Sequence, residues 1–384
     1  MISTPHVLVD ATAIPANRGG VGRYLEYLVP ALAAAGTQLT VLTTERDAEW
    51  MSRAAPTAAI IPIAGASGFR GGRLLWEQLR LPGLARRLGV DVVFSPHYTM
   101  PVLCPVPVVV TLHDATFFSL PKLHGRVKRI FFRVWSRYSL RHAALCVVPS
   151  EATRRELVSF AGGQANRIRV AYHGVDPTRF YPPTGAQIEA AASVLGTPEW
   201  ITFLGTLEPR KNIANLVRAF TTVAEHRPGM VLALAGGSGW DDELSGVIGA
   251  SAARDRIRKL GFVSDDELPG LLGGAVLVAY PSLGEGFGLP VLEAMACGAP
   301  VLTTRFLALP EVGGDVAAYT DPDSSSMATA LEALIDDPAD RADRSARGIE
   351  RATDFSWERS AETHVDAFRE AAGTTLVAER RRRS

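Results

Sequence analysis

The sequence contains little cysteine and no excess of charge of either sign. Its three cysteines, Cys104, Cys146 and Cys297, are scattered along the chain and show neither the spacing of metal ligands nor a disulfide framework. A reducing, cytoplasmic compartment is therefore predicted. The 40 basic residues (Lys and Arg) equal the 40 acidic residues (Asp and Glu), so the overall charge gives no reason to expect a nucleic acid partner.

Long apolar runs are also missing. No stretch approaches the ~20 uninterrupted apolar residues that a membrane-spanning helix requires, and Met1–Asp10 lacks the basic region and long apolar run of a signal peptide. We therefore expect neither a transmembrane helix nor a secretory leader. A chain of 384 residues exceeds the usual size of a single hydrophobic core, which predicts two domains.

The sequence does contain a regular alternation of short apolar runs and helix-length segments, which predicts parallel strands joined by crossover helices. In the first half, strands are expected at His6–Ala11, Gln38–Thr44, Ala58–Ile63, Asp91–Ser95, Val106–Leu112, Leu145–Pro149 and Arg167–Tyr172. In the second half, they are expected at Ile201–Leu204, Met230–Ala235, Ile257–Phe262, Ala275–Tyr280 and Pro300–Thr303. The fold class is therefore α/β, with two doubly wound domains at residues 1–178 and 179–357. The boundary is placed in the proline-containing segment Asp176–Thr184.

The segment Ser282–Pro300 carries the clearest functional pattern. The strand Ala275–Tyr280 precedes a loop with three glycines, and Pro290 stands where a first helical residue is expected. Such a loop lies at the carboxyl edge of a parallel sheet, where ligands bind to open α/β proteins. The free backbone N–H groups of a helix N-terminus attract phosphate there.

Two carboxylates, Glu285 and Glu293, frame this loop with seven residues between them. Phosphate would repel them, so they are expected to accept hydrogen bonds from sugar hydroxyls instead. Phosphate, ribose and hexose at one place indicate a nucleotide sugar. The alternative is a surface loop with two solvated glutamates, which the glycines and the proline at the helix start disfavour.

A second phosphate signal follows the strand Ile201–Leu204. Arg210 and Lys211 stand at the start of a helix, beside a backbone dipole of the same sign, which is unfavourable unless an anion binds there. A diphosphate fits, because Arg binds phosphate bidentately and Lys acts as a compact charge. The next glycine turn, Ala235–Gly239, lacks the Gly-Lys-Ser/Thr of a P-loop.

The first half offers weaker signals. The Gly19-Gly20 pair, after the first strand, allows the backbone to approach a ligand closely, although a purely structural turn is an equal alternative. His113 follows the strand Val106–Leu112 at a sheet edge, where a ligand could reach it. A lone histidine is more often a structural residue.

The segments Glu285-Gly286-Phe287-Gly288-Leu289-Pro290 and Glu293-Ala294-Met295-Ala296-Cys297-Gly298 together resemble the signature of the family-4 retaining glycosyltransferases of GT-B fold. The resemblance extends over nearly the whole chain. It implies two Rossmann-like domains facing a central cleft, the first binding the acceptor and the second the nucleotide sugar. By analogy of fold, a C-terminal helix at about 358–384 should pack back on the first domain.

The resemblance also implies site residues. Catalytic roles fall to His113, Glu285, Arg210 and Lys211. Nucleotide-sugar binding falls to Gly19, Gly20, Thr206, Arg210, Lys211, Gly236, Phe262, Val263, Glu285, Gly286, Phe287, Gly288, Leu289 and Glu293. Many members carry an arginine where this chain has Thr206, and Arg210 is expected to supply that charge. Glu293 should bond the ribose and Glu285 the sugar.

The family lacks a dedicated metal, and the chain shows no Asp-x-Asp pair at the expected strand ends, so neither a metal nor another cofactor is predicted. The resemblance implies that the configuration at the anomeric carbon is retained. Because no side chain is an obvious nucleophile, front-face attack is favoured over double displacement. The Gly19–Tyr24 and Gly205–Asn212 segments look most like bacterial mannosyl- and rhamnosyltransferases of polysaccharide assembly. GDP-mannose is the favoured donor, UDP- and dTDP-sugars remain open, and the acceptor is a glycan or a lipid-linked molecule.

Three other functions compete with that of a transferase. An epimerase of the same fold does not need the two glutamates at this spacing. A phosphorylase of the same fold should be longer and carry a lysine for pyridoxal phosphate. A non-catalytic nucleotide-sugar-binding protein would be expected to have lost one of Glu285, Glu293, Lys211 or His113, and this chain keeps all four.

The segment Arg126–Arg141 predicts a basic amphipathic helix. Five arginines recur at steps of three or four and share one face: Arg126, Arg129, Arg133, Arg137 and Arg141. Apolar and aromatic residues take another face: Val127, Phe131, Trp135 and Tyr138. Such a helix can lie on the inner face of an anionic membrane as a peripheral contact. The alternative is an ordinary surface helix whose aromatic face joins the core.

Overall fold

The computed structural model describes residues 4–14, 20–64 and 70–383. It divides into two units, Met1–Gly174 together with Ser356–Ser384, and Val175–Phe355. The sequence had placed the boundary after residue 178, but the structure places it after residue 174. The proline-containing segment that follows therefore belongs to the second unit.

The first unit contains a seven-stranded sheet in which every paired strand is parallel. Its order is β3-β2-β1-β4-β5-β6-β7. The strands are β1 His6–Asp10, β2 Gln38–Thr44, β3 Ala59–Ile63, β4 Val92–Ser95, β5 Val108–Thr111, β6 Leu145–Val148 and β7 Ile168–Val170. All seven strands predicted for this half are present, and the observed strands are mostly shorter because their ends turn into the loops of the sheet edge.

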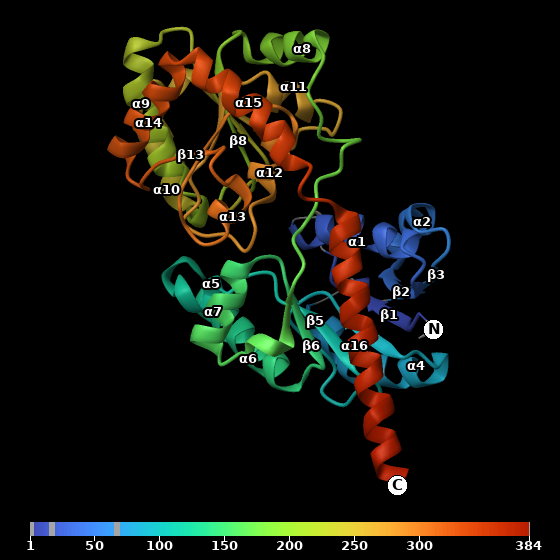
Figure 1. Cartoon of the computed structure of the whole chain (residues 1–384). Helices are drawn as coiled ribbons and strands as arrows, with labels where there is room; N and C mark the ends of the chain where they lie inside the picture. Colours follow the sequence, from blue (N-terminus) through green and yellow to red (C-terminus); the bar gives the residue numbers. More distant parts are fainter. Residues whose placement is uncertain (1–3, 15–19, 65–69, 384) are drawn as a thin grey trace. The chain divides into compact units, whose positions relative to one another are not determined.

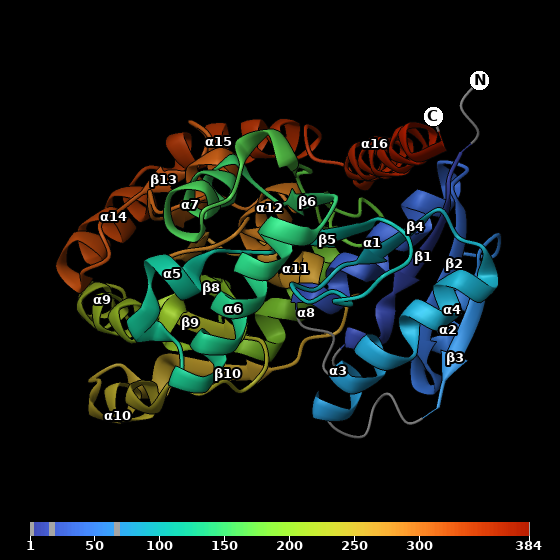
Figure 2. The same ribbon diagram turned by 90° about the horizontal axis from the view of Figure 1, so that it is seen from below.

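Helices cover both faces of this sheet (Figures 1 and 2). They are α1 Gly20–Ala34, α2 Glu45–Ala54, α3 Arg70–Leu79, α4 Leu81–Leu88, α5 Thr116–Ser119, α6 Arg126–His142, α7 Glu151–Ala161 and α16 Trp357–Arg383. The last of these returns from the far end of the sequence and packs on α1 and on β4 to β7. Its place in the first unit agrees with the prediction for a C-terminal helix.

The second unit contains a six-stranded parallel sheet of order β10-β9-β8-β11-β12-β13. Its strands are β8 Trp200–Leu204, β9 Val231–Ala235, β10 Ile257–Gly261, β11 Leu277–Tyr280, β12 Val301–Thr303 and β13 Ala318–Tyr319. Five of them were predicted. The edge strand β13 was missed, since two half-buried residues give no periodic signal.

The helices of the second unit are α8 Gly185–Leu195, α9 Ile213–His226, α10 Asp242–Ala250, α11 Leu268–Gly273, α12 Leu289–Ala296, α13 Leu309–Gly313, α14 Ser324–Asp336 and α15 Pro338–Ala352. Local chemistry explains how they begin: Thr184 and Gln187 form a capping box at α8, and the Asp323 side chain caps α14. Strands such as β8 and β9 are buried along their whole length, as helices on both faces require.

Both sheets reverse their winding beside their first strand, between β1 and β4 in one unit and between β8 and β11 in the other. Loops that follow such neighbouring strands diverge, and the space that they leave at the carboxyl edge is where doubly wound proteins bind ligands. The predicted doubly wound α/β fold is confirmed. Across the described residues, every helix is too short or too polar to cross a membrane.

Candidate functional site

The loop Ser282–Gly288 leaves β11 at the reversal point of the second sheet and leads into α12. Gly288 has φ 115°, a conformation that only glycine adopts without strain, and Pro290 lies in the first turn of the helix. The predicted strand, glycine-rich loop and helix are therefore all present.

The loop Gly205–Asn212 leaves β8 on the other side of the same reversal point. The two loops are joined by hydrogen bonds, because the backbone N–H of Leu283 donates to the carbonyl of Arg210 at 2.8 Å and Ser282 Oγ donates to the same oxygen at 3.2 Å. This contact brings residues that are 72 to 74 positions apart in the sequence into one site.

An ion cluster lies where the two loops meet. Glu285 Oε1 is 2.5 Å from Lys211 Nζ, and Glu285 Oε2 is 2.7 Å from an Arg210 guanidinium nitrogen. Arg210 also pairs with Glu208 at 2.6 Å. All four side chains are at most 18% exposed, so little solvent screens them. The sequence predicted three of these residues and missed Glu208, which stands two positions before Arg210.

Two hydroxyl groups complete the surroundings of Glu285. Tyr280 and Ser282 each donate a hydrogen bond to Glu285 Oε1 at 2.8 Å, and Lys211 Nζ also contacts the Tyr280 hydroxyl. Burial alone would raise the pKa of Glu285, but Arg210 and Lys211 outweigh it and hold that pKa far below the usual range. Burial and the neighbouring carboxylate raise the pKa of Tyr280 well above its ordinary value. The site therefore contains a carboxylate and a neutral phenol at any physiological pH.

This cluster is neutral overall, with the two cations Arg210 and Lys211 opposed by the two carboxylates Glu208 and Glu285. The sequence had assigned the cations to phosphate and Glu285 to sugar. The structure brings these groups into direct contact instead, so a diphosphate that enters here competes with the carboxylates for the cations.

The turn after β9 packs closely on the same site. The Leu207 N–H donates to the Gly237 carbonyl at 3.1 Å, and the Gly236 N–H donates to the Gly261 carbonyl at 2.7 Å. A Cβ atom at Gly236 would lie 2.2 Å from the carbonyl oxygen of Gly205, so only glycine fits. The backbone of this turn can therefore closely approach whatever binds beside the 205–212 loop.

The other residues that were predicted to bind the nucleotide sugar lie in different environments. Thr206 is half-buried, while Phe262 is 80% exposed at the end of β10 and Val263 is half-buried beside it. Glu293, on α12, is buried, with 3% of its side chain exposed. Phe287 is in the hydrophobic core, so only its backbone is available to a ligand, and half-buried Leu289 packs against that core.

In the first unit, His113 lies at the end of β5, where its Nε2 is 2.7 Å from the carbonyl oxygen of Pro96. A carbonyl only accepts, so Nε2 carries the proton and Nδ1 keeps its lone pair. Burial lowers the pKa of His113, which favours this neutral form. His113 can therefore accept a hydrogen bond through Nδ1.

A buried chain of polar groups lies next to His113. The Tyr24 ring meets the His113 ring edge-on at 4.9 Å between centroids, and the Tyr24 hydroxyl lies 2.7 Å from His364 Nε2 and 2.9 Å from Thr111 Oγ1. His364 Nδ1 is 2.7 Å from the carbonyl of Ser360, so that nitrogen is protonated and Tyr24 donates to the other. Burial lowers the pKa of His364 to about 4.

The sequence did not predict this chain, because Tyr24 and His364 are 340 positions apart. It also missed a third imidazole, His173, which stacks on Trp357 with centroids 5.4 Å apart. Only the return of α16 to the first sheet brings these rings together. Gly20 is the exposed first residue of α1, while Gly19 lies outside the described residues.

A second buried cluster occupies the reversal point of the first sheet. Arg73 on α3 lies 3.0 Å from Glu77 and 3.5 Å from Asp10 at the end of β1, and Thr99 donates to Glu77 at 2.7 Å. Burial raises the pKa of Glu77 to about 7, which Arg73 opposes. The sequence offered one overlooked signal for this cluster, an Arg and a Glu four residues apart on one helix.

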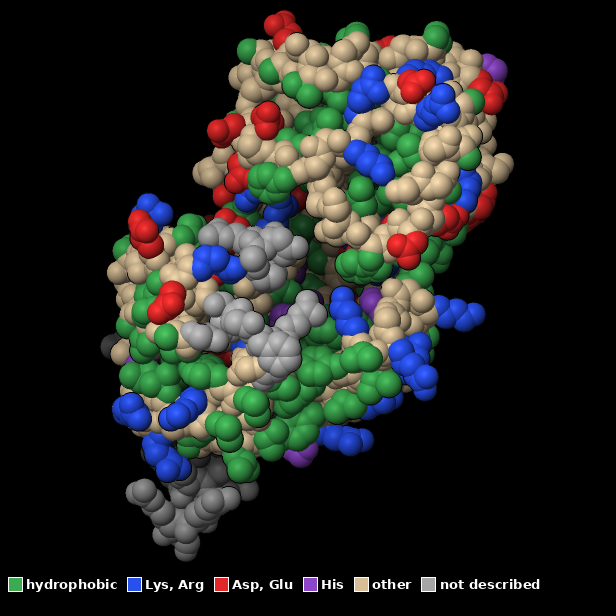
Figure 3. Space-filling model, turned by 180° about the vertical axis from the view of Figure 1, so that it is seen from behind, with side chains coloured by type: hydrophobic (Ala, Val, Ile, Leu, Met, Phe, Trp, Pro, Cys, Tyr) green, Lys and Arg blue, Asp and Glu red, His purple; other side chains and the backbone are tan. Residues whose placement is uncertain are grey.

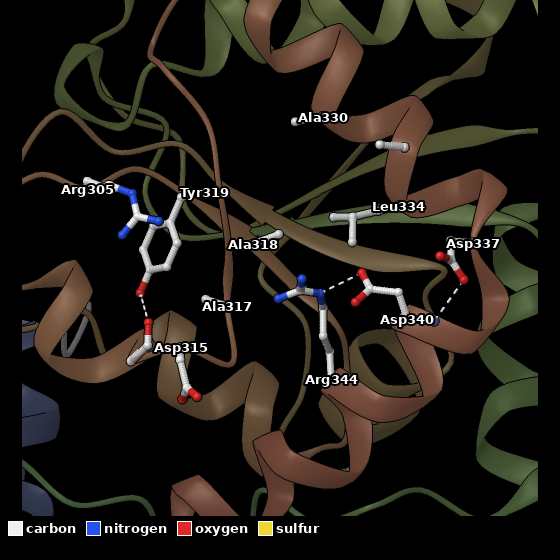
Figure 4. A pocket seen from close by; sticks show the side chains of 12 residues that line it. Arg305, Asp315, Ala317, Ala318, Tyr319, Ala330, Leu334, Asp337, Asp340 and Arg344 are labelled. Atoms are coloured by element: carbon white, nitrogen blue, oxygen red, sulfur yellow. Dashed lines mark hydrogen bonds and ion pairs between the residues drawn. The ribbon is translucent and has the colours of Figure 1, made fainter.

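A pocket lies elsewhere in the second unit, beside β13 and between α14 and α15 (Figure 4). Its polar groups are engaged with one another: Arg344 pairs with Asp340, the Tyr319 hydroxyl donates to the Gly314 carbonyl, and the Arg305 guanidinium lies 4.1 Å from the centre of the Tyr319 ring. None of the predicted site residues lines it. Among the residues that the structure describes, no group of three or more His, Cys, Asp or Glu side chains could hold a metal ion.

Comparison with known proteins gives two family matches. Residues 187–351 match the model of "Glycosyl transferases group 1", and residues 18–179 match that of "Glycosyltransferase Family 4". The chain is 34% identical to O-antigen chain mannosyltransferase B of Escherichia coli over 267 residues, which are 68% of this chain and 70% of that protein.

Solved structures share the fold. The chain resembles sucrose-phosphate synthase from Thermosynechococcus elongatus with a TM-score of 0.78 at 21% identity, covering 98% of this chain and 100% of that one. It resembles Anabaena HepE, solved in complex with UDP-glucose, with a TM-score of 0.75 at 20% identity, covering 97% of this chain and 100% of that one. The GT-B class expected from the sequence is confirmed by these likenesses.

Proposed function

Because the chain belongs to the group 1, family 4 glycosyltransferases and is therefore a transferase, we propose that it moves mannose from GDP-mannose onto a glycan or a lipid-linked acceptor in polysaccharide assembly. The observation that carries this proposal is the buried cluster of Arg210, Lys211 and Glu285 at the reversal point of the second sheet. The similarity to an O-antigen mannosyltransferase supports the choice of sugar.

The donor diphosphate binds Lys211 and Arg210, assisted by backbone N–H groups of the Gly236 turn and by Thr206. The base lies against the backbone of Phe262 and Val263, and Glu293 bonds the ribose. The loop Gly286–Leu289 approaches the donor through its backbone. The loop Gly205–Asn212 is hydrogen-bonded both to the turn after β9 and to the loop Ser282–Gly288, which supports these roles.

When the donor binds, Arg210 and Lys211 exchange Glu285 for the diphosphate. A diphosphate carries more negative charge than one carboxylate, so it displaces Glu285 from Lys211 and Arg210. The released carboxylate, held by Tyr280 and Ser282, then accepts hydrogen bonds from sugar hydroxyls. The ion pair thus keeps Glu285 ionised and in place before the donor arrives.

Transfer with retention follows by front-face attack, in which the acceptor hydroxyl approaches C1 from the side of the leaving diphosphate. The bond from C1 to the diphosphate oxygen breaks, the acceptor oxygen bonds to C1 on the same face, and the hydroxyl proton passes to the departing diphosphate. Arg210 and Lys211 stabilise the charge that develops on that diphosphate, usually the largest single contribution to such catalysis. His113 accepts a hydrogen bond from the donor sugar through Nδ1. No metal is required in this scheme, because protein cations neutralise the leaving group.

The test is a transfer assay with GDP-mannose in the presence of EDTA, using a bacterial lipid and glycan extract as acceptor and NMR to assign the anomer of the product. A retained α-mannosyl product is expected. If transfer occurs only from a UDP- or dTDP-sugar, that sugar and not GDP-mannose is the donor. An inverted anomer would overturn the front-face scheme. Binding of donors without any turnover would instead favour a non-catalytic nucleotide-sugar-binding protein.

We place the enzyme in the cytoplasm, with access to the inner face of the membrane, where lipid-linked acceptors are available. The composition of the chain supports this location, since its three cysteines are free.

A further inference from the structure

A charged cluster that takes no part in the proposed transfer lies at the carboxyl edge of the first sheet. Asp10 is the last residue of β1, and residues 96–99 follow β4. The sheet reverses its winding between these two strands, and doubly wound proteins bind ligands at such a point. Arg73 and Glu77, four residues apart on α3, reach this point from one helical face. The position therefore suits a ligand of the first unit.

The guanidinium of Arg73 is held by two carboxyl groups and one hydroxyl. Its Nη1 lies 3.0 Å from Glu77 and 3.5 Å from Asp10, and its Nη2 donates to Thr99 Oγ1 at 3.1 Å. Thr99 in turn donates to Glu77 at 2.7 Å. Among the residues that the structure describes, these contacts use three of the five N–H groups that a guanidinium carries. The other two are available to a ligand.

The arginine is the accessible member of this cluster. Its side chain is 15% exposed, whereas those of Glu77 and Asp10 are 1% and 3% exposed. Gln78 fastens the chain that follows β4 to α3, since its amide donates to Glu77 and to the Met100 carbonyl, each at 3.0 Å. A ligand can therefore touch Arg73, while the two carboxyl groups orient its guanidinium.

The charge of the cluster decides which kind of ligand fits it. Burial raises the pKa of Glu77 to about 7, which Arg73 opposes, so both forms of Glu77 occur near neutral pH. Even when Glu77 is protonated, the Asp10 carboxylate balances the charge of Arg73. The second sheet offers two cations to a diphosphate, but this cluster has no positive charge to spare. Its N–H groups therefore favour neutral oxygens, such as hydroxyls, over phosphate.

The cluster shares a short loop with the histidine that is assigned to the reaction. The Pro96 carbonyl accepts a hydrogen bond from His113 Nε2 at 2.7 Å, and three residues later Thr99 accepts one from Arg73. Both contacts lie within the first unit. A molecule bound at Arg73 therefore lies at the same edge of the sheet as His113.

We propose that Arg73 determines acceptor specificity by donating hydrogen bonds to the hydroxyl groups of an uncharged sugar. Three buried residues, Asp10, Glu77 and Thr99, position its guanidinium for this contact. The inference rests on the proposed function, because it names the part of the acceptor that the first unit recognises. That part is a sugar and not a phosphate group.

A purely structural role fits the cluster less well. Buried polar groups in a structural cluster normally find their partners within the protein. Arg73 instead keeps two N–H groups that no described residue uses, and part of its side chain is exposed. Both features occur at the point of the sheet where this kind of fold binds ligands.

The experiment is saturation-transfer NMR of the full chain without a donor. Mannose, mannobiose and N-acetylglucosamine are the uncharged probes, and mannose 6-phosphate is the charged probe. At least one uncharged sugar should bind, and mannose 6-phosphate should bind more weakly than mannose. Arg73→Lys keeps the charge but loses the planar fork, so it should weaken binding of the uncharged sugar about tenfold or more.

The matched control for Arg73→Lys comes from an exposed ion pair of the same unit. Figure 3 shows acidic and basic side chains next to one another on the surface of the first unit. In one exposed pair, Arg53 lies 3.6 Å from Glu49, four residues before it on α2, and their side chains are 73% and 86% exposed. Arg53→Lys should bind the sugars as the unchanged chain does.

Asp10→Asn/Glu77→Gln should reverse the preference, because it leaves the charge of Arg73 unopposed while both side chains keep their shape. This variant should bind mannose 6-phosphate about tenfold more tightly than mannose. The control Glu45→Gln/Glu49→Gln removes two exposed carboxylates from α2 and should keep the original preference. Thermal unfolding checks that each variant is folded, and Arg73→Lys alone decides the outcome if the double variant is not.

Several results would overturn the proposal. These are a lack of binding by any uncharged sugar, tighter binding of mannose 6-phosphate than of mannose by the unchanged chain, and unchanged sugar binding in Arg73→Lys. In the transfer assay, Arg73→Lys should raise KM for the acceptor and leave KM for GDP-mannose unchanged. A lower kcat and a lower melting temperature with the same acceptor KM would indicate a structural role instead. Sugar binding is measured without a donor, so its failure is distinct from failure of mannose transfer.

Discussion

The two sheets of this protein wind in the same order, yet the end of β5 in the first sheet and the ends of β8 and β11 in the second have opposite chemistry. In the second unit the edge carries ionised groups, with Arg210 and Lys211 paired to Glu208 and Glu285. In the first unit the edge beside β5 is occupied by neutral rings, in which burial lowers the pKa of His113, His173 and His364. A charged edge suits a diphosphate, whereas a neutral edge suits hydroxyl groups, which need directed hydrogen bonds rather than charge.

The largest expected effect is that of Glu285→Gln, which removes the carboxylate assigned to the sugar. Transfer should fall about 100-fold or more. Affinity for GDP should change far less, because a carboxylate opposes phosphate binding. Titration calorimetry and the transfer assay measure these two quantities, and exposed Glu189→Gln on α8 is the control.

The same substitution should also lower the stability of the ligand-free protein by about 3 kcal/mol, since it leaves buried Lys211 without its carboxylate and Arg210 with Glu208 alone. GDP should restore more stability to this variant than to the unchanged protein. Equal loss of transfer and GDP binding, with no change in stability, would contradict the roles given to the cluster.

Lys211→Met should weaken GDP binding about 30-fold or more, because a buried charge pairing with phosphate contributes at least about 2 kcal/mol. The matched control is Lys259→Met, which removes an exposed lysine from β10 in the same unit. If both variants bind GDP with the same affinity, the diphosphate does not lie at this edge.

The buried, neutral His364 of the first unit predicts that stability depends on pH. The pKa of His364 is about 4 in the folded protein and about 6.5 in an unfolded chain. Between these values the unfolded chain binds more protons, so stability falls as pH drops through 6.5, by up to about 1.4 kcal/mol per pH unit for this group. The loss is complete near pH 4.

Urea unfolding at a series of pH values measures this slope. His364→Asn should reduce the slope, whereas the exposed control His226→Asn should leave it unchanged. The absolute stability of His364→Asn will also fall, since the hydrogen bond from Tyr24 is lost, so the slope is the quantity to compare. An unchanged slope in His364→Asn would show that this histidine is not kept neutral by burial.

The smallest effect is expected for Tyr280→Phe, which removes one of the donors to Glu285. Stability should fall by about 1 kcal/mol, and transfer should fall by up to tenfold as Glu285 becomes less well held. Tyr319→Phe is a matched control, because that hydroxyl donates to the Gly314 carbonyl away from the cluster. It should cost similar stability without any loss of transfer.

The sequence predicted the layout of both sheets because buried parallel strands leave short apolar runs between helices, as in β2 and β9. It predicted Glu285 and Lys211 because glycines and cations beside a helix start have few structural uses. It could not predict that these two side chains pair with each other, since the contact depends on how two loops from distant strands meet. The sequence could not predict the Tyr24–His364 hydrogen bond for the same reason. The strand β13 has too few residues to produce a periodic pattern.

The most direct test of the central claim, that the edge of the second sheet binds a nucleoside diphosphate through protein cations, is calorimetric titration with GDP in EDTA. The account predicts binding to the unchanged protein without metal, and its loss in Lys211→Met but not in Lys259→Met. If no nucleoside diphosphate binds in EDTA, or if Lys211→Met binds as tightly as the unchanged protein, the cluster is not the donor site.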